Sequence, residues 1–155
     1  GYDPLPYFME PEESPYSTPE VYKEFPLILS TGGRLPFYFH GQYRQIPWLR
    51  ELQSYPLVQI HPDTAKRYGV EEGDWVWIET QRGRIKQRAN LCAGMDPRSV
   101  IAQSSWWYPE RSGPLHGILE TNTNILTSNE SFDPATGAPN FRALLCKIYK
   151  VKEGE

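Results

Sequence analysis

The sequence predicts a mainly β domain with short helices, closed into a small barrel. Fifteen prolines and an aromatic content of 14% in 155 residues disfavour a helical protein and favour strands and loops. Short apolar runs bounded by Gly, Pro or Asp indicate strands, and the segments between them are long. Short strands joined by long connections are typical of small closed β-barrels.

Composition limits the kinds of partner. The chain is long enough for one domain with its own core, and its net charge of −3 comes from interspersed acidic and basic residues. This pattern has no basic stripe of the kind that binds nucleic acid, and no apolar run approaches the roughly 18 residues that span a bilayer. We therefore expect a soluble protein with no nucleic-acid binding and no membrane insertion.

The cysteines and histidines give no metal-binding pattern. Cys92 and Cys146 lie far apart in apolar, strand-like contexts, so we expect buried free thiols rather than a disulfide or a metal pair. The three histidines are equally scattered, which makes a metal site formed by this chain alone improbable.

Residues 1–24 are predicted to form an extended linker or strap, and residues 25–155 the barrel domain. The first segment is rich in proline, acidic and aromatic residues, so we expect neither a helix nor a central strand in it. It either links to a preceding domain or lies on the barrel through Tyr2, Tyr7, Phe8 and Tyr16. A strap of this kind suggests that the chain is part of a longer protein.

The first half of the predicted domain alternates strands with short helices. We expect a buried strand at 24–31 and a half-buried strand at 56–62, with one short helix or turn in 46–55 between them. A two-turn helix then begins near Pro62 and ends at Gly69.

Residues 71–91 are the clearest hairpin in the sequence. The outgoing strand has two alternating faces, and "QRGR" turns the chain back. These faces consist of Val76, Ile78 and Thr80, and of Trp75, Trp77 and Glu79. Another strand lies within "DPRSVIAQSSWWYPE", and a loop of about 35 residues, long enough to suggest function, leads to a last strand at 142–151.

The stretch "STGGRLPFYFHGQYR", residues 30–44, is unusual for either a core strand or a solvent loop. A glycine pair, two arginines, three aromatic residues and a histidine follow an apolar strand within a few positions. Glycines allow a ligand to approach the backbone, arginines supply fixed positive charge, and aromatic rings supply flat surfaces. The combination indicates a large anionic heterocyclic ligand.

Three ordered motifs carry a family resemblance over about residues 25–151. They are a strand running into Thr-Gly-Gly-Arg with a His beyond it, the stretch "IHPDTAKRYGVEEGDWVWIETQRGRI", and the stretch "NILTSNESFDPATGAPNFR". Together they resemble the C-terminal molybdopterin-dinucleotide-binding domain of the dimethyl-sulfoxide-reductase superfamily, and the strap resembles the linker of its anaerobic-dehydrogenase type. This superfamily includes formate dehydrogenases, nitrate reductases and the tungsten enzyme acetylene hydratase. The resemblance implies a double-psi β-barrel.

The resemblance also implies a cofactor and a division of labour. Family members hold molybdenum or tungsten between two molybdopterin guanine dinucleotides, the bis form, and this domain caps both. The metal ligand and any iron–sulfur cluster belong to other domains, so no catalytic residue is expected in this chain. Its partners would be the remaining domains of the parent oxidoreductase, with iron–sulfur subunits as a further possibility, in a prokaryotic cytoplasm or periplasm.

The resemblance carries over a set of cofactor-binding residues from four parts of the chain. An anion-cradling turn and the end of the same stretch supply Thr31, Gly32, Gly33, Arg34, His40 and Gly41. One indole, of Trp106 or Trp107, would lie against the cofactor. The Asn-x-Leu-Thr loop supplies two rival asparagines, Asn122 and Asn124. The basic residue that opens the last strand is Arg142.

Structural roles remain open alternatives for these residues. Arg34 and Arg142 would then be surface charges, the two tryptophans core or interface residues, and Asn124 a cap of its own loop. The alternative function is a stand-alone double-psi barrel that serves as a protein-interaction or adaptor module. An adaptor has no need for the set formed by the Gly-Gly-Arg turn, Asn124 and Arg142.

Overall fold

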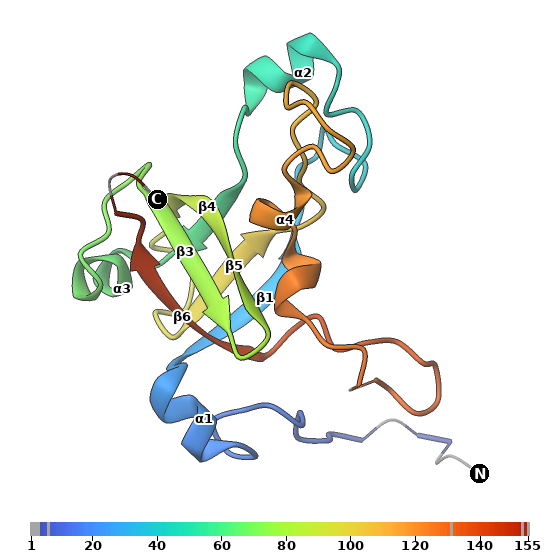
Figure 1. Cartoon of the computed structure of the whole chain (residues 1–155). Helices are drawn as coiled ribbons and strands as arrows, with labels where there is room; N and C mark the ends of the chain where they lie inside the picture. Colours follow the sequence, from blue (N-terminus) through green and yellow to red (C-terminus); the bar gives the residue numbers. More distant parts are fainter. Residues whose placement is uncertain (1–3, 6, 131, 153, 155) are drawn as a thin grey trace.

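A closed barrel of six strands forms the body of the protein (Figure 1). The computed structural model describes residues 4–5, 7–130, 132–152 and 154. The strands follow the order β1-β5-β2-β4-β3-β6 around the barrel, with β1 parallel to β5, β2 parallel to β4, and the other neighbours antiparallel. Their bounds are Leu27–Gly33 (β1), Leu57–Ile60 (β2), Trp75–Thr80 (β3), Gly83–Leu91 (β4), Ser99–Gln103 (β5) and Leu144–Lys150 (β6). The predicted mainly β fold and double-psi barrel are confirmed.

The helices are short and lie outside the barrel. They are α1 (Pro19–Glu24), α2 (Pro47–Leu52), α3 (Pro62–Arg67), α4 (Ile118–Thr121) and the 3-10 helix η1 (Thr123–Leu126). Three of them begin at proline, whose fixed φ suits the first helical turn and whose missing N–H is no loss there. The predicted 35-residue loop is therefore wrong in part, because α4 and η1 interrupt it.

The alternation of the hairpin residues sets the inside of the barrel. Val76, Ile78 and Thr80 are buried, as predicted, while the intervening residues of β3 are only partly covered. Thr80 is the polar member of this face, and its hydroxyl donates to the carbonyl of Leu126 at 3.1 Å. Burial of a large aliphatic side chain stabilises the fold by about 1.5–3 kcal/mol, and the Thr80 bond fixes η1 against the barrel.

The two cysteines differ in burial. Cys146, in β6, is fully buried, and burial raises the pKa of its thiol. Cys92 follows β4 and is partly exposed, so the prediction of a buried thiol is right for Cys146 and wrong for Cys92. None of the helices in the described part of the chain is long and apolar enough to cross a membrane.

A second, aromatic core lies beyond the end of the barrel. Residues 34–55 and 104–117 run beside each other there and carry α2 at the tip (Figure 1). Their shared core is Tyr38, Trp106 and Tyr108, with the edge of the Trp106 ring packed against Tyr38 at 5.9 Å between centroids. We call this pair of segments the lobe.

The N-terminal strap differs from its prediction in one way, and its exposed aromatic residues decide between two alternatives. Residues 19–24 form helix α1, because Pro19 stands at its first turn, where proline is tolerated. Tyr7, Phe8 and Tyr16 are exposed by 66%, 81% and 84%, so these aromatic residues do not attach the strap to the barrel. Tyr2 lies outside the described residues.

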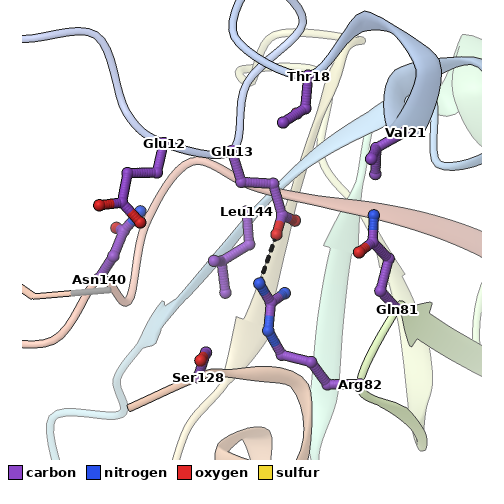
Figure 2. Close-up of a pocket in the computed structure, with 9 residues that line it drawn as sticks. All are labelled: Glu12, Glu13, Thr18, Val21, Gln81, Arg82, Ser128, Asn140 and Leu144. Atoms are coloured by element: carbon purple, nitrogen blue, oxygen red, sulfur yellow. Dashed lines mark hydrogen bonds and ion pairs between the residues drawn. The ribbon is translucent and has the colours of Figure 1, made fainter. Parts of the chain in front are cut away.

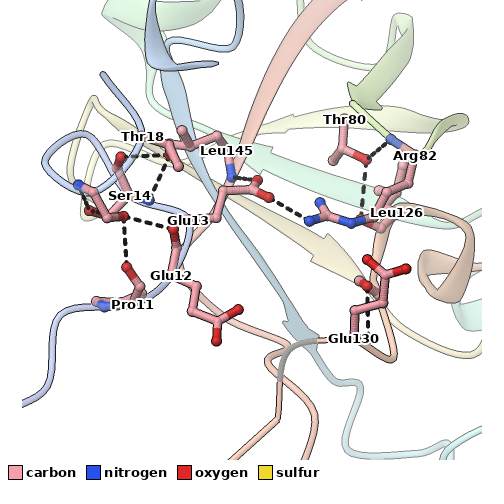
Figure 3. Close-up of polar contacts among 12 residues, drawn as sticks. Pro11, Glu12, Glu13, Ser14, Thr18, Thr80, Arg82, Leu126, Glu130 and Leu145 are labelled. Atoms are coloured by element: carbon pink, nitrogen blue, oxygen red, sulfur yellow. Dashed lines mark hydrogen bonds and ion pairs between the residues drawn. The ribbon is translucent and has the colours of Figure 1, made fainter. Parts of the chain in front are cut away.

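Glu13 makes the attachment instead. One carboxylate oxygen accepts the backbone N–H of Leu145 in β6 at 2.6 Å, and the other accepts from Arg82, in the β3–β4 turn, at 2.6 Å (Figure 3). The Ser14 hydroxyl next to it accepts two backbone N–H groups and tightens the turn before α1. Glu13 therefore joins the strap to strand β6 and to the β3–β4 turn at once.

A cavity of about 220 Å³ lies beside this contact (Figure 2). The strap, the β3–β4 turn and β6 all contribute to its wall, with Glu12 and Asn140 on one side of it. Because Arg82 is already paired with Glu13, the cavity has no free excess of positive charge.

We predict that Glu13→Ala lowers the free energy of unfolding by about 2–4 kcal/mol, because it leaves a largely buried N–H and a partly buried guanidinium unpaired. Glu13→Gln keeps an acceptor for Leu145 and should cost less. The exposed pair of Glu20 with Lys23 offers a matched control, and Glu20→Ala should leave the stability unchanged. Urea denaturation of the three variants measures this, and equal stability of Glu13→Ala and Glu20→Ala would contradict the attachment.

Candidate functional site

A polar cavity of about 250 Å³ lies where the lobe meets the barrel. Strands β1 and β5 are parallel, so their C-terminal ends reach the same edge, and the segments that follow them form two walls. Helix η1 and the residues before β6 complete the site. The lining residues are Thr31, Gly32, Arg34, His40, Ser104, Ser105, Thr123, Asn124, Phe141 and Arg142.

The structure brings together six of the predicted site residues at this cavity. They come from segments that are far apart in the sequence: Thr31, Gly32, Arg34, His40, Asn124 and Arg142. The others predicted, Gly33, Gly41, Trp106, Trp107 and Asn122, are not among its lining residues.

Thr31 acts as a clip between two walls of the cavity. Its backbone N–H and its hydroxyl both donate to the carbonyl of Phe141, at 3.0 and 2.9 Å. The clip holds the segment before β6 against the end of β1, and a Cβ placed on Gly32 would lie 3.8 Å from Nε of Arg142. Thr31 is 4% exposed, and its donors are already used, so it shapes the site rather than offering a donor.

The two glycines of the Gly-Gly-Arg turn have different roles. A Cβ on Gly33 would lie 2.8 Å from the carbonyl oxygen of Ala102, so this glycine is needed for the close approach of β1 to β5. A Cβ on Gly32 would meet nothing closer than 3.6 Å. Gly32 thus leaves room in the cavity, whereas Gly33 has a clear role in the barrel, and its place in the ligand cradle stays a prediction.

The two tryptophans serve the lobe. One of the two indoles is predicted to face the cofactor, and the full burial of Trp106 in the aromatic core leaves Trp107 as the candidate. Trp107 donates its indole N–H to the carbonyl of Gly41, and its ring lies 5.6 Å from that of His116. Trp107 and Gly41 thereby fix the turn that presents His40.

The two rival asparagines are separated by their hydrogen bonds. The Asn122 side chain accepts the backbone N–H of Asn124 at 3.0 Å and caps η1. The Asn124 residue is exposed and lines the cavity. The geometry favours Asn124 over Asn122 as a ligand-binding residue.

Charge distinguishes this cavity from the hollows beside α2, beside α3 and under the strap. Arg34 and Arg142 are exposed at its rim, and no Asp or Glu is among the described residues that line it. By contrast, the wide hollows beside α2 and beside α3 are lined by glutamates, and the cavity under the strap holds a paired arginine. An anionic ligand therefore suits the cavity at the end of β1 and β5.

Four lining residues escaped the sequence analysis: Ser104, Ser105, Thr123 and Phe141. Ser104 and Ser105 directly follow the strand that pairs in parallel with β1, and this pairing was the one signal that could have located them. Phe141 contributes to the site through its backbone carbonyl, which accepts from Thr31. A contact made by the backbone leaves no side-chain pattern in the sequence.

We predict opposite outcomes for alanine at the two glycines. Gly33→Ala should destabilise the protein by about 1–3 kcal/mol, because its methyl group meets the backbone of β5. Gly32→Ala should change stability by under about 1 kcal/mol while narrowing the cavity. Thermal denaturation and ligand content of the two variants check this, and a stability loss confined to Gly32→Ala would reverse the assignment.

Comparison with known proteins identifies the family. A family model described as Molydopterin dinucleotide binding domain matches residues 27–145. The chain is 44% identical, over 94% of its length, to the dopamine dehydroxylase of Eggerthella lenta, and it covers 14% of that protein. It is 36% identical, over 97% of its length, to the acetylene hydratase of Syntrophotalea acetylenica, of which it covers 22%.

A solved structure supports the same relationship. Acetylene hydratase from Pelobacter acetylenicus matches 97% of this chain with a TM-score of 0.90 and 35% sequence identity, and the match covers 22% of that chain. The chain thus spans between 14% and 22% of the length of these relatives. Because the family model covers most of the barrel and the relatives agree with it in sequence and fold, the chain belongs to the molybdopterin dinucleotide binding domain family of the dimethyl-sulfoxide-reductase superfamily.

Proposed function

We propose that this chain is a cofactor-binding domain of a molybdenum or tungsten oxidoreductase that holds a bis(molybdopterin guanine dinucleotide) cofactor. In this proposal the cavity at the ends of β1 and β5 caps part of the cofactor, and catalysis takes place on other domains. The observation that carries it is the gathering of Arg34, Asn124 and Arg142 around one cavity without a lining carboxylate among the described residues.

The chemistry of these donors fits the anionic and heteroatom-rich parts of such a cofactor. Arg34 and Arg142 each offer a planar fork of N–H donors for phosphate or pterin oxygens. The Asn124 amide can both donate and accept, and Gly32 leaves its backbone open to close approach. The bound metal and its dithiolene ligands would supply the redox chemistry.

The size of the cavity is consistent with a shared site. Its volume of about 250 Å³ lies below the range of pockets that enclose drug-sized ligands, so this chain would contact only part of a dinucleotide. The relatives are several times longer than this chain. We infer that the remaining domains of the parent protein supply the other contacts, with residues 1–24 as the strap toward them and 25–155 as the binding domain.

The adaptor alternative is not favoured by the structure. An adaptor would present a peptide-binding groove and would have no use for two arginines converging on a cavity beside a glycine. Exposed aromatic residues do occur, and Phe141 is one that lines the cavity, but the lining also gathers Arg34, Asn124 and Arg142, which a peptide-binding groove would not need.

We predict that Arg34→Ala in the full-length protein lowers cofactor retention roughly 10- to 100-fold, because it removes a charge-assisted hydrogen bond. Arg34→Lys should recover only part of the loss, since one ammonium cannot reproduce the fork. Arg98, exposed and paired with Asp96, provides the control variant Arg98→Ala. Metal and guanine nucleotide per mole of purified protein are measured, and equal contents in all variants would refute the site.

We also predict that the isolated 155-residue chain shows no viologen-linked redox turnover. The described residues hold no group of His, Cys, Asp or Glu suited to a metal ion, and the proposal assigns the metal ligand to another domain. The activity assay would use purified chain with and without added cofactor. Turnover that copurifies with the chain through several columns would contradict this division of labour.

A further inference from the structure

Arg44 is a buried cation without a carboxylate partner among the described residues. It is 2% exposed, and its guanidinium donates to three backbone carbonyls of the lobe. Nε donates to Ser105 at 3.3 Å, and Nη2 donates to His40 at 3.2 Å and to Ser104 at 3.4 Å. These three carbonyls come from both segments of the lobe, so Arg44 cross-links them.

Two aromatic rings compensate part of the cost of burying this charge. The guanidinium carbon lies 4.2 Å from the centre of the Tyr38 ring and 4.0 Å from that of Trp106. Stacking of this kind suits arginine, whose planar and weakly hydrated group prefers such surfaces to a lysine ammonium. Burial lowers the pKa of Arg44 to about 10, which leaves the group protonated at neutral pH.

The carbonyls that Arg44 holds belong to strained turns. His40 has φ 51° and Ser105 has φ 57°, in the left-handed region that residues with a Cβ rarely adopt. Both residues line the cavity. Ordering two such turns requires a contact that fixes them, and Arg44 makes one with each.

We propose that Arg44 is a positioning residue, which clamps the turns at His40 and Ser105 and so sets the wall of the cofactor cavity. The inference rests on the proposed function of the cavity. Arg44 does not touch the ligand in this account, but acts through the backbone of the two turns.

A direct contact is the competing role. Nη1 of Arg44 has no hydrogen-bond partner among the described residues, and Arg44 lines a void of about 10 Å³ together with Arg34 and His40. A void of this size holds at most one water molecule, so it offers little space for a ligand group. The experiment separates the two roles.

The variants are Arg44→Met and Arg44→Lys in the full-length protein, with Arg50→Met as the matched control. Met keeps an apolar stem between the rings and removes the donors, whereas Lys keeps the charge and loses the fork. Arg50 also lies over Trp106, at 5.5 Å, but it bonds Ser54 and Glu110 rather than the cavity wall. If Arg44→Met does not accumulate as folded protein, Arg44→Lys provides the test.

Cofactor retention is the first measurement, as pterin and guanine nucleotide per mole of protein after dialysis. We expect Arg44→Met to lower cofactor retention roughly 10- to 100-fold, because it removes a contact that supports the binding groups. Arg44→Lys should lower cofactor retention less. Arg50→Met should retain the wild-type content. Equal retention by Arg44→Met and Arg50→Met would overturn the proposal.

Backbone hydrogen exchange is the second measurement, and it does not depend on the cofactor. We expect Arg44→Met to speed exchange in residues 40–42 and 104–106, and Arg50→Met to leave these two segments unchanged. If wild-type protein carries no pterin, the proposed function fails, whereas the exchange data still test the clamp. Unchanged exchange in both segments would overturn the clamp itself.

A cycle with Ser105→Gly tests whether Arg44 acts through the turn at 105. Glycine adopts a positive φ at little cost, so the turn at 105 would depend less on Arg44 in this background. Arg44→Lys should lower cofactor retention by some factor in the wild-type background. We expect this loss to be less than half as large in the Ser105→Gly background. A loss of the same size in both backgrounds would show that Arg44 does not act through the turn at 105, and would overturn the proposed clamp of both turns.

Discussion

Strands β1 and β5 run parallel, with Leu29 opposite Val100. Both strands therefore end at the same edge of the barrel. A parallel pair cannot be joined by a tight turn, so the connection between the two strands passes through the lobe, β2 and the β3–β4 hairpin before returning. This arrangement places Arg34 and Ser105 on facing walls. The Thr31 bonds to Phe141 then bring Arg142 to the same edge, which makes the cavity a direct consequence of barrel closure.

Three arginines near this edge show how burial decides what a charge can do. Arg34 and Arg142 are exposed at the cavity and have their donors available to a ligand. Arg44 has the same chemistry, but two stacked rings and three carbonyls commit its donors to the fold. A residue type in a motif is therefore ambiguous until its burial is known. "GGRLPFYFHGQYR" contains one arginine that is exposed at the cavity and one that is buried behind its wall.

The strands and the family could be predicted from the sequence, because alternation along the hairpin and three ordered motifs are local features. The surroundings of each single side chain could not be predicted in this way. Trp106 and Trp107 stand side by side in the sequence, yet one fills a core and the other fixes a turn, and only the path of the lobe decides between them. The strap was misjudged for a similar reason, since Pro19 forbids a helix interior but permits a first turn.

The cavity also places an electrostatic demand on the domain. Two exposed guanidinium groups line it, and among the described lining residues no carboxylate offsets them. An anion that entered the cavity would pair with these groups in the folded state and would have no equivalent site in the unfolded chain. Binding would therefore add to stability by mass action. The barrel carries its own core and the strap its own ion pair, so the domain can hold this excess of positive charge before a ligand arrives.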